Sequence, residues 1–282
     1  MAVRPLEALV QRGFDVALVV TRPDKRRGRG SALQPSPVKA AAAALGLEVT
    51  HRVDDALAAG ADLGVVVAYG QLIKRHVLEV LPMVNLHFSL LPRWRGAAPV
   101  ERALLAGDAE TGVCLMQLEE GLDTGAVFGC ERVPITARTT AAALRADLVR
   151  AGTELLVSSL EGGLGDPRPQ FGEPTYAAKI EPAELAIDWS RPAEELDRLV
   201  RLGGAWTTLR GQRLKVLAAE VDPAPGDVMP VEWVPGAVDG DRVGTGHGAL
   251  VLREVQPEGR APMAAVAWRN GARIAPGERL GT

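Results

Sequence analysis

The chain has few cysteines, few aromatic residues and no long hydrophobic run, and each shortage excludes a class of protein. Among its 282 residues, Cys114 and Cys130 are the only cysteines, too far apart for a CxxC redox motif or a zinc site. We expect buried free thiols and no structural metal. No stretch approaches the roughly 20 apolar residues of a membrane span, and no signal-peptide core follows Met1. A cytoplasmic protein without membrane association is expected.

The chain also lacks a strong excess of acidic or basic residues. The chain carries 35 acidic and 32 basic residues, a net charge of −3 at pH 7. This balance gives no overall nucleic-acid signature, so any contact with RNA must come from a local basic patch. With 47% hydrophobic residues, the chain is long enough for one large domain or two modest ones with proper cores.

Helix and strand signals alternate over the first half of the chain, which is typical of a parallel α/β sheet. Apolar runs predict strands at residues 16–20, 63–68, 84–88 and 113–118. Helical periodicity predicts helices around 6–10 and at 38–45, 98–106 and 140–160. We therefore predict a domain with a doubly wound α/β sheet over residues 1–166.

The composition changes after Gly162. Glycine and proline become frequent without a clear period, which indicates a linker over residues 167–188. One helical pattern follows at 194–202, and then short β-like runs broken by Gly and Pro. Short strands at this spacing favour a small β-barrel domain over residues 189–282.

Three polar residues in the first half form the strongest functional signal. Asn85 and His87 are separated by one residue, so on a strand both side chains project from the same face. Asp123 lies in a Gly-Leu-Asp-Thr-Gly turn that can hold a carboxylate at the edge of the sheet. The loop after the strand, at 89–96, is where open α/β sheets bind ligands.

These residue types point to transfer of an acyl or formyl group. No Ser, Cys or Lys is paired with the histidine, and there is no Gly-x-Ser-x-Gly motif, so covalent catalysis is disfavoured. An amide and an imidazole aimed at one carbonyl oxygen would form an oxyanion hole. A nearby carboxylate would set the charge of the imidazole or accept a proton through water.

A basic segment at residues 21–30 suggests a polyanionic substrate. Arginine and lysine on a glycine-containing loop match phosphate oxygens, although such a run can equally be a solvated loop. The pair Gly28 and Gly30 lacks the third glycine of a dinucleotide site, so we do not predict NAD binding.

Longer motifs resemble a known family, the methionyl-tRNA formyltransferases. They are VVVAYG, NLHFSLLPRWRGAAP, GDAETGVCLMQLEEGLDTG, TYAAKI, IDWSRPAEEL and EVQPEGRAPM. The central block is shared with other folate-dependent formyltransferases. The QPSPVK helix start behind the basic loop, IDW and the last motif favour the tRNA enzymes.

The resemblance implies a Rossmann-like formyltransferase domain, a linker and an OB-like β-barrel domain. It implies 10-formyltetrahydrofolate as co-substrate, initiator methionyl-tRNA as acceptor and no metal. We also expect a monomer. It assigns catalysis to Asn85, His87 and Asp123. Folate contacts fall on Ser89, Leu90, Leu91, Pro92, Val67, Ala68, Tyr69 and Gly70, and tRNA contacts on Arg29, Lys25, Arg26 and Arg27.

The chain departs from the family pattern in three places. The family's first strand, with a Gly-Thr-Pro turn, is missing before the first helix, and the segment at 53–62 is short. From Trp189 onward, 12 basic residues balance 12 acidic ones, although a domain that guides tRNA is expected to be basic. Two alternatives follow: a formyltransferase of a small amine such as a nucleotide sugar or glycinamide ribotide, or a non-catalytic RNA-binding homologue.

Overall fold

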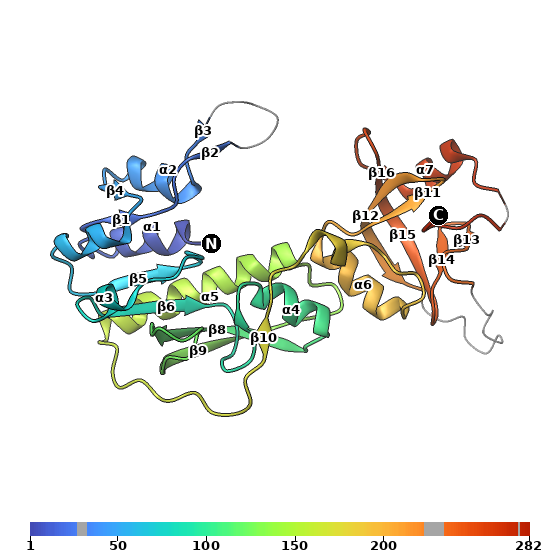
Figure 1. Ribbon diagram of the computed structural model, residues 1–282. Helices are drawn as coiled ribbons and strands as arrows, with labels where there is room; N and C mark the ends of the chain where they lie inside the picture. Colours follow the sequence, from blue (N-terminus) through green and yellow to red (C-terminus); the bar gives the residue numbers. More distant parts are fainter. Residues whose placement is uncertain (27–32, 223–233, 276) are drawn as a thin grey trace. The chain divides into compact units, whose positions relative to one another are not determined.

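The protein folds into two compact units in the computed structural model, which describes residues 1–26, 33–222, 234–275 and 277–282 (Figure 1). The N-terminal unit comprises Met1–Ala103, Ala109–Ile135 and Ala143–Lys179. The C-terminal unit comprises Leu104–Asp108, Thr136–Ala142 and Ile180–Thr282. The C-terminal unit thus includes two short segments from the first part of the chain in addition to the residues from Ile180 onward.

Helices and short strands alternate through the first half, which confirms the α/β class. In chain order they are α1 (Val3–Gln11), β1 (Val19–Val20), β2 (Lys25–Arg26), β3 (Leu33–Gln34), α2 (Pro37–Ala44), β4 (Val49–Thr50), η1 (Val53–Ala58), β5 (Gly64–Val67), α3 (Arg75–Leu78), β6 (Met83–His87), β7 (Arg95–Gly96), α4 (Pro99–Ala106), β8 (Glu110–Gln117), β9 (Val127–Pro134), α5 (Ala141–Glu161) and β10 (Tyr176–Ala177).

The sheet lies in two pieces. The pair β1–β4 is parallel, and a separate four-stranded sheet has the order β5-β6-β8-β9. In the second piece β5 and β6 are parallel, whereas β6–β8 and β8–β9 are antiparallel. No pairing among the described residues joins β1 to β5, so the continuous sheet implied by the sequence pattern is interrupted there.

Both faces of the four-stranded sheet are covered. Leu86 on β6 and Leu115 on β8 are fully buried with Leu144 and Leu148 of α5, and Leu9 of α1 joins the same cluster. The α5 helix runs along the sheet in Figure 1. The opposite face carries a smaller cluster of Ile73, Val77, Leu81 and Met83. Burial on both faces explains the nearly continuous apolar runs of these strands.

The start of α2 follows from local sequence. Ser36 is the N-cap, and its hydroxyl oxygen accepts a hydrogen bond from the Lys39 backbone N–H at 3.0 Å. Pro37 occupies the first helical turn, where a missing N–H costs nothing. The QPSPVK motif therefore fixes the point at which the chain leaves the basic loop and enters a helix.

The C-terminal unit is an antiparallel sheet with helices, as the short β runs indicated. Its elements are η2 (Pro182–Leu185), α6 (Ala193–Leu202), β11 (Trp206–Leu209), β12 (Gln212–Val221), β13 (Val238–Asp239), β14 (Arg242–Gly244), β15 (Ala249–Pro257), β16 (Met263–Ala264) and α7 (Ala265–Ala272). The strand order is β11-β12-β15-β14-β13, with β16 on β15. Within the described ranges, no pairing closes this path into a barrel.

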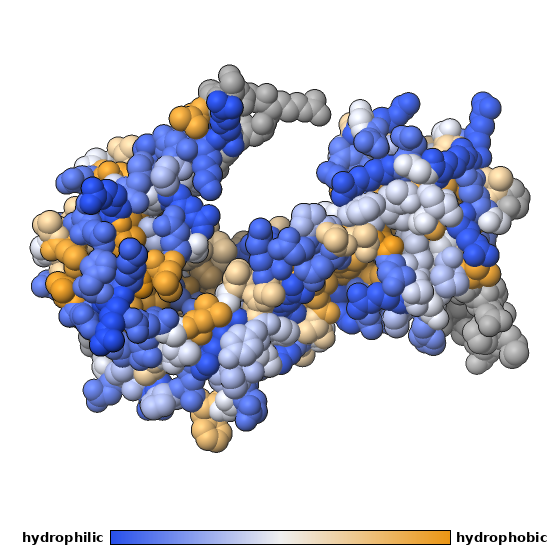
Figure 2. All heavy atoms as spheres, in the orientation of Figure 1, coloured by the Kyte–Doolittle hydropathy of each residue, from blue (hydrophilic) through white to orange (hydrophobic). Residues whose placement is uncertain are grey.

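The molecular surface is largely hydrophilic on the face shown in Figure 2, with hydrophobic atoms in small groups. Large exposed apolar residues such as Leu72 and Phe171 are scattered along the chain, which is normal for a folded protein. Within the described part of the chain, no helix is long and apolar enough to cross a membrane, and no cluster of His, Cys, Asp or Glu has the makings of a metal site.

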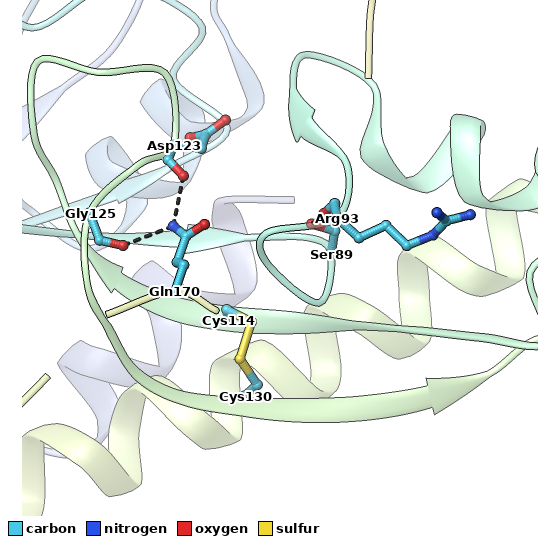
Figure 3. Close-up of a disulfide and its surroundings, with 7 residues drawn as sticks. All are labelled: Ser89, Arg93, Cys114, Asp123, Gly125, Cys130 and Gln170. Atoms are coloured by element: carbon cyan, nitrogen blue, oxygen red, sulfur yellow. Dashed lines mark hydrogen bonds between the residues drawn. A yellow bond between two sulfur atoms is a disulfide. The ribbon is translucent and has the colours of Figure 1, made fainter. Parts of the chain in front are cut away.

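The prediction of free cysteines is wrong. Cys114 and Cys130 form a disulfide between β8 and β9, with their sulfur atoms 2.05 Å apart (Figure 3). The two residues are direct partners in the antiparallel register, so their side chains project from the same face of the sheet. The disulfide could not be predicted from the spacing of the two cysteines, which are 16 residues apart. The pairing of Cys114 with Cys130 depends on the register of β9, and the sequence did not predict this strand.

We expect the disulfide to stabilise the N-terminal unit. Replacing both cysteines by serine should lower the free energy of unfolding by about 3 kcal/mol, because a closed loop of this length restricts the unfolded chain by that amount. Urea unfolding with and without reductant measures the difference, and the double variant should not respond to reductant. Alkylation of two free thiols in the denatured, unreduced wild type would contradict the assignment.

Candidate active site

The two-residue period of β6 places its core residues on one face and its candidate functional residues on the other. Val84 and Leu86 point into the main core, whereas Asn85 and His87 point to the opposite face. Both polar residues are buried, with exposed fractions of 9% and 5%. In the register with β8, His87 faces Cys114, so the disulfide lies on the same face of the sheet as the histidine.

His87 is held between two acceptor atoms. Its Nε2 lies 2.9 Å from the carbonyl oxygen of Trp94, and its Nδ1 lies 3.5 Å from Oδ2 of Asp123. Because a carbonyl oxygen only accepts, Nε2 carries a hydrogen in this arrangement. The ring is therefore oriented by the loop that follows its own strand and by the turn that follows β8.

Asp123 is brought to this place by an unusual backbone conformation. Its φ is +51°, in the left-handed region, and its side chain is 13% exposed. Its Oδ2 accepts a hydrogen bond of 2.8 Å from the backbone N–H of Gly96. One carboxylate oxygen thus serves both the imidazole and the β7 backbone, which fixes the carboxylate relative to the ring.

The amide of Asn85 is the free member of the trio. No hydrogen bond joins its side chain to a described residue, although the residue as a whole is only 9% exposed. Its amide atoms are not among the fully buried polar atoms that lack a partner, so the amide group retains access to solvent. An unpaired amide one residue from an oriented histidine is therefore available for a ligand.

The first predicted folate segment folds back over the sheet. Ser89 is fully buried and its hydroxyl donates to the carbonyl oxygen of Arg93 at 2.6 Å. Leu90 packs against Gly112 of β8 so closely that a Cβ on this glycine would lie 2.4 Å from a Leu90 methyl carbon. The Leu91–Pro92 peptide bond is cis. These contacts shape the loop, and none of them involves Asn85.

The second predicted folate segment, residues 67–70, is tied to the root of the basic loop. Arg22 donates from Nε to the carbonyl oxygen of Tyr69 at 3.2 Å and from Nη2 to that of Gly70 at 2.9 Å. Burial raises the pKa of Tyr69 above its usual value, and the nearby positive charge of Arg22 partly opposes this. The Tyr69 hydroxyl therefore remains neutral at physiological pH.

Backbone strain gathers in the loops around the trio. Ala68, Trp94 and Asp123 are three of the five non-glycine residues with positive φ in the described ranges. They follow β5, β6 and β8, respectively. Residues held in this region of φ and ψ persist where the surroundings over-determine them, and they tend to cluster at functional sites.

The predicted tRNA residues are only partly described. Lys25 and Arg26 form the exposed strand β2, whereas Arg27 and Arg29 lie outside the described residues. The root of the loop is fixed on α2 through the ion pair between Asp24 and Lys39 at 2.9 Å.

Sequence analysis missed the contribution of residues 168–177, which it expected to be linker. Gln170 contacts the Asp123 turn (Figure 3), and β10 pairs in parallel with β7. Thr175 accepts through Oγ1 a hydrogen bond of 2.9 Å from the Trp94 N–H. The proline-rich composition of this segment hid these contacts, because they involve mostly backbone groups.

Comparisons with known proteins assign the chain to one family. The Formyl transferase family model matches residues 2–160, and the Formyl transferase C-terminal domain model matches residues 179–273. Together they span most of the chain. The chain belongs to the formyl transferase family.

Among curated proteins, the similar sequences include several methionyl-tRNA formyltransferases. A methionyl-tRNA formyltransferase of Symbiobacterium thermophilum is 46% identical, and the match covers 98% of this chain and 90% of that relative. A methionyl-tRNA formyltransferase of Roseobacter denitrificans is 45% identical, with coverage of 96% and 93%. These values confirm the predicted family.

Solved structures share the fold at lower identity. WlaRD, a sugar 3N-formyl transferase, gives a TM-score of 0.66 at 17% identity, covering 92% of this chain and 95% of that one. HypX from Aquifex aeolicus gives a TM-score of 0.63 at 17% identity, covering 96% of this chain and 45% of that one.

The turn that carries Asp123 has a sharp steric requirement. A Cβ at Gly125 would lie 1.9 Å from the carbonyl oxygen of Gln117, a backbone atom that cannot move aside cheaply. Gly125→Ala should therefore displace the turn, lower the free energy of unfolding by about 1–3 kcal/mol and reduce activity. Gly271→Ala in α7 is the matched control, because nothing lies within 4 Å of its Cβ position. Equal stability and activity of the two variants would contradict this account of the turn.

Proposed function

We propose that this protein transfers the formyl group of 10-formyltetrahydrofolate to the amino group of initiator methionyl-tRNA. The observation that carries the proposal is the identity of 42–46% to methionyl-tRNA formyltransferases over nearly the full chain. The buried trio supplies groups suited to this chemistry. We expect the enzyme to act as a monomer in the cytoplasm, where the translation machinery supplies its acceptor.

Asn85 and His87 stabilise the charge that forms during the reaction. The methionyl nitrogen attacks the formyl carbon, a C–N bond forms, and the carbonyl oxygen becomes an oxyanion. The Asn85 amide donates to this oxygen. The His87 Nε2–H, which donates to the Trp94 carbonyl in this structure, exchanges that partner for the oxyanion. The C–N bond to the folate then breaks as the carbonyl re-forms.

Asp123 controls the proton. Its Oδ2 faces Nδ1 of His87 at 3.5 Å, so it orients the ring and balances positive charge on it. The attacking amine loses a proton and the folate nitrogen gains one, and the pair of His87 and Asp123 assists this movement. No nucleophilic side chain and no covalent intermediate are needed.

The two folate segments flank Asn85 and His87 in the chain. The loop 89–92 follows β6 directly, and the loop 67–70 follows β5, the parallel neighbour of β6. Ligands bind at the carboxyl ends of parallel strands in such sheets. We therefore assign the folate to the space that these loops border, with the formyl group toward Asn85.

The C-terminal unit supports a role in tRNA binding despite its balanced charge. Several of its acidic side chains are paired: Glu220 and Asp241 with Arg253, Asp222 with Arg242, and Glu278 with Arg210. On the β11–β12 hairpin, Arg213 packs over the ring of Trp206 at 4.3 Å, and Lys215 is the register partner of Trp206. Neither cation has a carboxylate partner among the described residues. An aromatic ring with two available cations suits a nucleic acid.

The alternatives are not favoured. A small amine needs neither the basic loop nor this hairpin. A non-catalytic RNA-binding homologue would have no need of an available amide beside an oriented histidine.

The central test removes the imidazole. His87→Ala should lower formyl transfer by at least about 10²-fold and leave tRNA affinity nearly unchanged, because the group acts on charge rather than on docking. The exposed His76, which pairs with Asp54, gives the control His76→Ala. The assay measures formylmethionine released from the tRNA after ester hydrolysis. Wild-type turnover by His87→Ala would refute the assignment.

A second test concerns the basic loop. Arg29→Ala should weaken binding of methionyl-tRNA and reduce the slope of log affinity against log salt by about 0.9, the value for one lost phosphate contact. Arg12→Ala is a control, because Arg12 is the exposed C-cap residue of α1 and pairs with Glu161. An unchanged affinity at every ionic strength would show that Arg29 makes no contact with the tRNA.

A further inference from the structure

Residues 168–177 bind both of the loops that orient His87, and we call this segment the strap. At its start, Arg168 and Val127 exchange two backbone hydrogen bonds of 2.8 Å. At its end, β10 pairs with β7, and the Ala177 carbonyl accepts from Ala97 and Ala98 at 2.9 and 3.1 Å. The strap is therefore fixed at both ends on strands of the N-terminal unit.

Gln170 lies between these two anchors and uses its whole amide group. Its Nε2 donates to the carbonyl oxygens of Asp123 and Gly125, each at 2.8 Å. Its Oε1 accepts from Nε and Nη2 of Arg95, at 3.1 and 2.6 Å. Figure 3 shows the side chain pointing at the Asp123 turn. Two donors and two acceptor positions are satisfied, so the amide has one possible orientation.

These contacts act on both sides of the hydrogen bond between the Asp123 carboxylate and the Gly96 N–H. The amide fixes the backbone of Asp123, whose Oδ2 contacts His87 and accepts from the Gly96 N–H. The same amide fixes Arg95, the neighbour of Gly96 in β7. Gln170 thus links the turn that carries the carboxylate to the loop that receives it.

The conformation of Asp123 makes such support necessary. A non-glycine residue at φ +51° is unfavourable on its own and persists only when its surroundings impose it. The Gly96 N–H acts on the side chain of Asp123, whereas Gln170 acts on its main chain. Without Gln170, the turn loses two of the hydrogen bonds that define its shape.

We propose that Gln170 is a positioning residue for the reaction: it sets the distance between Asp123 and His87 by clamping the Asp123 turn to β7. This proposal rests on the proposed function and extends it to a residue outside the catalytic trio. Gln170 does not touch the substrates. Its effect should fall on turnover, because misplacement of a reacting group by about 1 Å can cost about 10²-fold in rate.

Two variants separate the two halves of the clamp. Gln170→Met keeps the volume of the side chain and removes all four hydrogen bonds. Gln170→Glu keeps the acceptor toward Arg95 and adds charge to it, but it places a carboxylate oxygen against the carbonyls of Asp123 and Gly125. Gln11→Glu, at the exposed end of α1, is a control for the added charge.

Kinetics and melting temperature give the first readout. For both Gln170 variants we expect kcat to fall about 10- to 100-fold, with KM for folate and tRNA within about twofold, since uniform binding is not altered. The Tm should stay within about 4 °C of the wild type. The kcat of Gln170→Glu should be at least as low as that of Gln170→Met. The new carboxylate pairs more strongly with Arg95, but it repels the carbonyl oxygens of Asp123 and Gly125.

The imidazole gives a second readout that needs no substrate and is therefore independent of the proposed function. The chain has four histidines, so the ring ¹⁵N resonances of His87 can be assigned by comparison with the His87→Ala variant. In both Gln170 variants these resonances should shift, while those of the other three histidines should not.

Three outcomes would overturn the proposal. One is wild-type kcat in Gln170→Glu. Another is that both variants lose kcat because their Tm falls below the assay temperature. In that case, spectra recorded at a lower temperature, where the variants are folded, would show no shift of the His87 resonances. The third is an increase in KM alone, which would place Gln170 in substrate binding.

Discussion

The approach of His87 Nδ1 to Asp123 Oδ2, at 3.5 Å, is the contact on which the site depends. It requires that β6 present its odd-numbered residues away from the main core and that the turn after β8 reach the same face. The first condition follows from the period of a strand, because Val84 and Leu86 are committed to the core with α5. The second needs a left-handed residue at 123, and the surrounding loops impose it.

The loops around the trio are held by hydrogen bonds that leave the Asn85 amide without a protein partner among the described residues. The rest of the site is densely hydrogen-bonded: Ser89 closes its own loop, Arg22 holds the carbonyls of Tyr69 and Gly70, and Gln170 holds the Asp123 turn. Within this framework the Asn85 amide keeps its donors without a protein partner. A site arranged in this way is organised before its ligands arrive, which lowers the reorganisation needed at the moment of reaction.

Much of this could be predicted from the sequence, and the failures have physical causes. Apolar runs located β5, β6 and β8, and the Asn-x-His pair with the glycine-flanked Asp123 pointed to one site. The strand β9 was missed because it lacks an apolar run: the consecutive residues Cys130, Glu131 and Arg132 in its middle are all exposed. With β9 missed, the Cys114–Cys130 disulfide could not be foreseen. The role of Gln170 was hidden because its contacts are long-range and its segment has no period.

The most direct test of the account is a structure with a non-transferable formylated folate bound. We predict that the formyl oxygen lies at a hydrogen-bonding distance of about 3 Å from the Asn85 side-chain nitrogen, with His87 and Asp123 still in contact. A formyl group bound elsewhere, or an Asn85 amide turned to a partner within the protein, would contradict the claim that the trio acts on one carbonyl.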